Sequence, residues 1–267
     1  MGHTRLGKIP TTRRWREVVA IFAGAGSDTG SSDFSSEVPE LAASTMDAAT
    51  NALKAALKDG GIAYVFFILT QLALSSRRAS SDEALRSLGI RLPLQASHLD
   101  LTSEIHRIID EHFLRMGRKS DLAEMAQLAL GETLTAFFRS QPGDLFSPSA
   151  IQVQRDLHQL GTQKTFGEIS RRFFSGLMSR MLGFYLSKFV LPGEDQRLIG
   201  GANDLTRFNS ELRIHTYQRA AIIHEFAEKW FSKTEFEKGI DPANTRRFVS
   251  YACKKLEAEF MRGMDGK

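Results

Sequence analysis

The sequence predicts an all-α protein, an irregular bundle of about nine helices with no sheet. Helix start and stop signals recur along the chain, and apolar residues recur at spacings of three and four. No segment shows the sustained two-residue alternation of a half-buried strand. The 267 residues are enough to bury a substantial core, and 42% hydrophobic with 25% charged residues is ordinary for a globular protein.

The N-terminal part of the chain is expected to differ from the rest. Either of two adjacent threonines, at positions 11 and 12, can cap a first helix, and residues 24–36 are rich in Gly and Ser, as flexible loops are. We therefore assign residues 1–36 to a basic helix and a flexible loop, and residues 37–267 to a helical bundle domain. If that domain has two lobes, they meet near residues 141–147.

Local signals divide the bundle domain into helices. Ser80 with Glu83, and Thr165 with Glu168, match the capping-box pattern, and Ser147 precedes a proline suited to the first helical position. The expected helices cover residues 39–59, 62–75, 80–89, 99–116, 120–139, 147–161, 165–191, 204–233 and 241–262.

The two most apolar segments do not predict a membrane span. Residues 62–74 fall short of the roughly 20 apolar residues that cross a bilayer. Residues 166–190 are interrupted by Arg and Lys, which disfavours a span. Apolar side chains surround much of this aromatic-rich helix, so it is expected to run through the middle of the bundle or to complete an interface. Without a secretory signal pattern, and with Cys253 as the only cysteine, a cytoplasmic location is expected.

The helix expected over 204–233 places polar residues in an apolar stripe. His215 and Arg219 lie on the same face as six large apolar residues, and both are expected to be buried. A buried Arg219 needs a carboxylate or carbonyl partner, because unpaired burial of a charge costs several kcal/mol. The alternative is a recognition or catalytic arginine in a cleft. The stripe consists of Phe208, Leu212, Ile222, Ile223, Phe226 and Trp230.

Two Arg–His pairs are the candidate catalytic residues. Arg107 with His112, and Arg219 with His224, resemble the R-x4-6-H motif of HEPN ribonucleases, in which the arginine and histidine polarise a phosphodiester and manage a proton. A spacing of five residues within a helix turns the two side chains about 140° apart, which disfavours joint action. An α-helical ribonuclease using one of these pairs is one alternative function.

Metal and cofactor chemistry is not expected. The segment from His224 to Glu228 has the form H-E-x-x-E, which lacks the second imidazole of the zinc motif. No glutamate has a histidine three residues later, as di-iron carboxylate bundles require, and no phosphate-binding loop motif occurs. The sequence therefore predicts no metal site and no cofactor.

Basic clusters are the candidate binding surface. Arg13, Arg14 and Arg16 lie near the N-terminus, and Arg171 and Arg172 lie on the aromatic helix. Arginine suits bidentate contact with carboxylate or phosphate. The formal net charge of +4 is small, however, and acidic residues lie among the clusters. Binding of nucleic acid or of an anionic membrane surface is a second alternative function.

Three stretches carry a resemblance to a known group. TRRWREVVAIFAGA, SDLAEMAQLALGETLTAFF and IHEFAEKWFSKTEFEKGIDPANTRRFVSYACKKLEAEF look like parts of uncharacterised bacterial all-helical proteins associated with anti-phage defence and mobile-element loci. The resemblance implies a genomic setting and no catalytic residue. The function expected first is that of a non-enzymatic sensing or scaffolding subunit of a bacterial anti-phage defence system. It would act through contacts with a protein partner or within a homo-oligomer.

Overall fold

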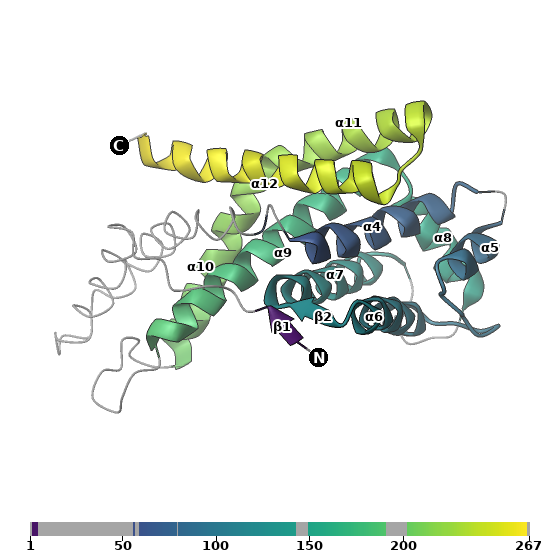
Figure 1. Ribbon diagram of the computed structural model, residues 1–267, viewed down its shortest axis with the longest axis horizontal. Helices are drawn as coiled ribbons and strands as arrows, with labels where there is room; N and C mark the ends of the chain where they lie inside the picture. Colours follow the sequence, from purple (N-terminus) through teal and green to yellow (C-terminus); the bar gives the residue numbers. More distant parts are fainter. Residues whose placement is uncertain are drawn as a thin grey trace.

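The computed structural model describes residues 2–4, 56, 59–78, 80–142, 149–190 and 202–265. The prediction of an all-α bundle is confirmed for these residues, and no helix in them is apolar over enough length to cross a membrane. Figure 1 shows α4 (Gly60–Ser75), α5 (Ser81–Ser87), α6 (His98–Arg115), α7 (Asp121–Arg139), α8 (Ala150–Leu160), α9 (Gln163–Val190), α10 (Ala202–Arg219), α11 (Ala221–Lys238) and α12 (Pro242–Asp265).

Several predictions lie outside the described residues. These are the first helix and the Gly/Ser loop of residues 1–36, most of the helix expected over 39–59, and most of the junction near 141–147. At the N-terminus, Gly2–Thr4 (β1) pairs in parallel with Arg118–Ser120 (β2), between α6 and α7. This two-stranded pair was not expected from the sequence, and it is too short to change the fold class.

Side-chain caps begin most of the helices. Ser80 accepts a hydrogen bond from the Glu83 N–H at 3.2 Å, and Ser120 accepts one from the Ala123 N–H at 2.9 Å, as predicted. Helix α8 begins later than predicted, with Ser149 as its cap, because Ser149 is anchored by its own N–H to the Ala96 carbonyl. Helix α9 begins before the predicted Thr165, at Gln163.

The helix expected over 204–233 is two helices, which corrects the prediction. Ala220 has ψ of 1°, which breaks the helical pattern, and its carbonyl accepts from the Ile223 N–H three residues ahead. The break divides the segment into α10 and α11, and each of these helices packs against α9. As a result the buried line differs from the predicted stripe, and it consists of Leu212, Thr216, Ala220, Ile223, Ala227 and Phe231.

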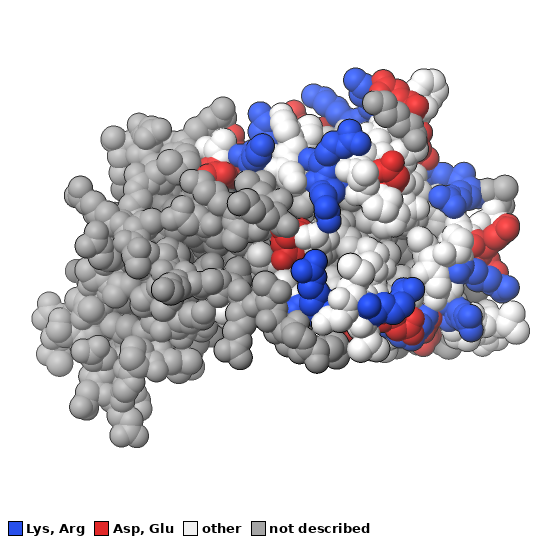
Figure 2. Space-filling model, viewed as in Figure 1, with Lys and Arg blue, Asp and Glu red and all other residues white. Residues whose placement is uncertain are grey.

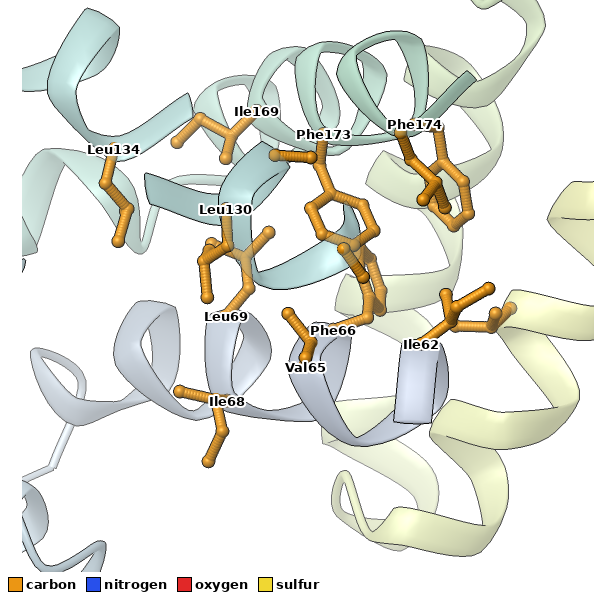
Figure 3. Close-up of a cluster of buried hydrophobic side chains, with 14 of the residues drawn as sticks. Ile62, Val65, Phe66, Ile68, Leu69, Leu130, Leu134, Ile169, Phe173 and Phe174 are labelled. Carbon is orange, nitrogen blue, oxygen red and sulfur yellow. The ribbon is translucent and has the colours of Figure 1, made fainter. Parts of the chain in front are cut away.

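Helix α9 runs diagonally through the middle of the molecule, as the sequence predicted (Figure 1). It packs against α7, α8, α10 and α11. Its side chains Phe173 and Phe174 meet Phe66 of α4 at ring-centroid distances of 5.4 and 5.3 Å (Figure 3). This aromatic cluster lies within one hydrophobic core that draws residues from all nine described helices.

Three polar side chains, those of Cys253, His98 and Asp156, are buried and have structural roles. Cys253 is 1% exposed, and burial raises the pKa of its thiol to about 12, so the thiol stays protonated and unreactive. His98 Nε2 of α6 and Asp156 Oδ2 of α8 lie 2.8 Å apart, and both side chains are 2% exposed. The His98 ring also packs on Phe138, with ring centroids 4.4 Å apart. The pair therefore ties α6, α7 and α8 together away from solvent.

Candidate protein-binding groove

An open groove of about 1620 Å³ lies between α7 and α10, which both pack on α9, with α6 at one side. Helix α9 contributes Ser175, Gly176 and Ser179, which are small, together with Arg172 and Arg180. Helix α7 lines the groove from Leu128 to Arg139. The groove is therefore a trough along three helices rather than an enclosed pocket.

Most of the charged side chains that line the groove are arginines. Among the described residues its lining includes Arg139, Arg172, Arg180 and Arg213, with Glu132 as the one carboxylate. Glu132 Oε1 lies 2.5 Å from Arg180 Nη2 and 3.4 Å from Arg213 Nη2, so one carboxylate of α7 serves arginines of both α9 and α10. The described lining of the groove thus has more guanidinium groups than carboxylates.

Two large apolar side chains lie in the same groove, exposed to solvent. Leu128 of α7 and Ile214 of α10 both line it, and each is 46% exposed. Neither belongs to the hydrophobic core of the bundle. Exposed apolar side chains that gather in a concave site are typical of surfaces that bind another molecule.

His106 lines the groove from α6 without adding charge. Its Nδ1 lies 3.1 Å from Gln127 Nε2, which also donates to Asp110 Oδ1 at 3.1 Å. Burial lowers the pKa of His106, and Lys119 adds to this effect while Asp110 opposes it. The ring is therefore neutral at pH 7. A side chain at Gly131 would meet His106 Nε2 at 2.6 Å, so the glycine makes room for the ring.

A network centred on Glu168 joins α9, α10 and α11 at one end of the groove. Glu168 Oε1 accepts from Arg172 Nε at 2.8 Å and from the Tyr217 hydroxyl at 2.7 Å. Arg171 stacks on the Tyr217 ring, 3.8 Å from its centroid, and donates to the Tyr217 carbonyl. His224 Nδ1 of α11 lies 3.5 Å from Glu168 Oε2. The network fixes the angle between the three helices.

The Glu168 network is expected to make stability depend on acid pH. Partial burial disfavours the Glu168 charge, but the bonds from Arg172 and Tyr217 and the nearby arginine charges outweigh it, so its pKa is lower than usual. The stabilisation is therefore present above the usual pKa of glutamate and is lost as pH falls through the lower folded-state value. Glu168→Gln should cost about 1–2 kcal/mol at pH 7.

Urea denaturation of both proteins between pH 7 and pH 3 measures this effect. The difference in unfolding free energy between wild type and Glu168→Gln should shrink as pH falls. Glu225→Gln is the control, because the Glu225 side chain is 77% exposed and pairs only loosely with Lys229. A difference that stays constant over the whole pH range would refute the role of the Glu168 charge.

The first candidate Arg–His pair is engaged in other contacts. Arg107 donates to Glu104, Glu111 and the Gly89 carbonyl, and the bond to Gly89 ties the middle of α6 to the residues that follow α5. The His112 ring stacks on Tyr64, with centroids 3.5 Å apart and planes 9° apart. Both side chains therefore have structural partners.

The second candidate pair is divided between two helices. Arg219 is the last residue of α10 and donates to the Glu259 carbonyl of α12 at 2.5 Å. A carbonyl is one of the two kinds of partner expected for this arginine from the sequence. His224 of α11 faces the Glu168 network instead. His215 and Arg219 were predicted to be buried, but both are half-buried, because they lie beside the buried line that runs through Leu212, Thr216 and Ala220.

The predicted binding arginines have different outcomes. Arg171 and Arg172 belong to the Glu168 network, and Arg172 also lines the groove. Arg13, Arg14 and Arg16 lie outside the described residues. On the face shown in Figure 2, the described Lys and Arg side chains are spread out, with Asp and Glu among them, and form no single basic patch there.

Sequence reasoning missed the central groove residues, Leu128, Glu132, Arg180, Arg213 and Ile214. One signal was present, because Leu128 lies off the buried face of α7 formed by residues such as Leu130 and Leu134. That these side chains share one groove depends on how α7 and α10 are placed around α9. Within the described ranges, no group of His, Cys, Asp and Glu is arranged to hold a metal ion.

The fold and the groove together define an α-helical protein with an arginine-rich, partly apolar trough on its surface. Comparison of the chain with protein families, curated proteins and solved structures gives no significant match.

Proposed function

We propose that this protein is a non-enzymatic binding protein that holds a helical segment of another protein in the groove between α7, α9 and α10. The observation that carries the proposal is the exposure of Leu128 and Ile214, at 46% each, in one groove with four arginines. Amphipathic helices bind in grooves of this kind through apolar anchors. A sensing or scaffolding role in bacterial anti-phage defence is part of the proposal and rests on the resemblance of the sequence.

A binding function is favoured over catalysis because the candidate catalytic side chains have structural contacts. Arg107 and Arg219 donate to protein acceptors, His112 stacks on a tyrosine, and the Cys253 thiol is buried and protonated. The groove histidine, His106, is held by Gln127 at its Nδ1. These side chains support the architecture of the groove.

Site-specific photo-crosslinking tests the proposal. A benzophenone amino acid replaces Leu128 or Ile214 in cells of the organism that encodes the protein, and Leu94 serves as the control because it is 97% exposed outside the groove lining. We expect a defined protein adduct from both groove positions and none from Leu94. The adduct from the Leu128 position should disappear when Arg213→Glu is added. Equal adducts from all three positions, or none from the groove, would refute the proposal.

A further inference from the structure

We infer that the groove binds an acidic amphipathic helix, and that Glu132 occupies the place of a partner carboxylate while the groove is empty. The inference rests on the proposed function and names the chemical class of the partner. It follows from the charge, the length and the apolar side chains of the groove.

The arginines of the groove have unused donor capacity. Arg180 and Arg213 share the Glu132 Oε1 atom, and the buried Nε of Arg180 has no hydrogen-bond partner among the described residues. Arg139 makes no ion pair with a described carboxylate. A guanidinium group is best satisfied by a carboxylate in bidentate contact, so this set of arginines suits two or more carboxylates of a partner.

Glu132 has the features of a stand-in for a ligand. Its carboxylate reaches from α7 to arginines on two other helices, and its side chain is 49% exposed. It therefore keeps Arg180 and Arg213 pointing into the groove, in a position that solvent and a partner can reach. A partner carboxylate would compete with Glu132 for the same guanidinium groups.

The length of the groove matches a short helix. Lining positions run from Leu128 to Arg139 on α7 and from Thr206 to Gln218 on α10. At 1.5 Å per residue, each run is about 17–18 Å long, which accommodates about three turns of a bound helix.

The apolar side chains favour a protein helix over a nucleic acid. Leu128 on one wall and Ile214 on the other each leave about half of their surface open to solvent. An amphipathic helix covers such side chains with its apolar face and offers acidic residues to the arginines beside them. A phosphodiester backbone would use the arginines and leave both apolar side chains uncovered.

A peptide titration with the full chain tests the inference. The probe is a fluorescent 18-residue peptide of Leu, Ala and Glu, with leucines along one helical face and glutamates on both flanks. A matched peptide carries Lys in place of Glu, and a labelled 20-nucleotide RNA is the third probe. Fluorescence anisotropy at low and at moderate salt gives the dissociation constants.

The expected results separate the groove from general electrostatics. The acidic peptide should bind at least tenfold more tightly than the lysine peptide. Arg213→Glu should weaken binding of the acidic peptide at least tenfold. Arg86→Glu should leave it unchanged, because Arg86 is not among the residues that line the groove. Arg86 is a matched control, since both arginines pair with a carboxylate and the side chains of Arg213 and Arg86 are 68% and 70% exposed. Glu132→Gln should tighten binding of the acidic peptide several-fold by freeing Arg180 and Arg213. Circular dichroism and thermal melts confirm that each variant is folded.

Each contrary result overturns a defined part of the inference. Equal binding of the two peptides removes the preference for acidic helices, and weaker binding by Glu132→Gln removes the stand-in role. RNA that binds more tightly and is lost with Arg213→Glu would make nucleic acid the occupant. Self-association that blocks the peptide would make a second copy the occupant. Crosslinks at Leu128 and Ile214 without peptide binding would refute this inference alone, and absence of both would refute the proposed function as well.

Discussion

Replacing Phe66 with alanine is expected to lower the free energy of unfolding by about 3–5 kcal/mol. Phe66 is fully buried, and its ring lies within 5.2–6.5 Å, centroid to centroid, of five aromatic rings from α9, α11 and α12. Removing it deletes the aromatic contacts that join α4 to all three helices and leaves a cavity that rigid rings cannot fill. Figure 3 shows its position between α4 and α9.

Urea denaturation followed by circular dichroism measures this loss. The denaturation midpoint should fall while the slope of unfolding free energy against urea stays close to the wild-type value. Phe236→Ala is the matched control, because Phe236 is 91% exposed and its loss should change stability by less than about 0.5 kcal/mol. A similar cost for both substitutions would show that Phe66 is not at the centre of the core.

Replacing Gly167 with alanine is expected to destabilise the protein by about 1–3 kcal/mol. A Cβ atom at Gly167 would lie 2.8 Å from the His224 carbonyl oxygen, closer than real Cβ contacts allow. Because the obstacle is the backbone of α11, the two helices must move apart to relieve it. This movement would also disturb the contact between His224 and Glu168.

Gly183→Ala in the same helix is the control for Gly167→Ala. No described atom lies within 4 Å of a Cβ at Gly183, so alanine should stabilise α9 there by about 0.5–1 kcal/mol through its helix propensity. Thermal unfolding of both variants should therefore give shifts of opposite sign. Shifts of the same sign would mean that α9 and α11 are not in close backbone contact at Gly167.

Local chemistry explains which parts of the fold were predictable. Ser80 and Ser120 cap helices within three residues of themselves, and Asp241 caps α12 by a reciprocal bond with Asn244, so the signals lie in adjacent sequence. The bend at Ala220 has no glycine, proline or capping side chain to announce it. Both α10 and α11 pack on α9, and the sequence pattern does not predict these contacts between distant residues.

The groove shows the same division. Its arginines and its exposed Leu128 and Ile214 are visible as residues, but Glu132 meets Arg180 and Arg213 across 48 and 81 positions of the chain. The helical period of the sequence does not predict which exposed faces of α7 and α10 lie opposite one another.

The sequence alone determined the all-α class, most helix boundaries and the central place of the aromatic helix. These properties follow from hydrogen bonds within one turn and from the burial of apolar faces. The tertiary structure decided the break at Ala220, the half-exposure of His215 and Arg219, the Glu168 network and the groove. Each of these depends on contacts between residues far apart in the chain, whose geometry is set only when the helices pack.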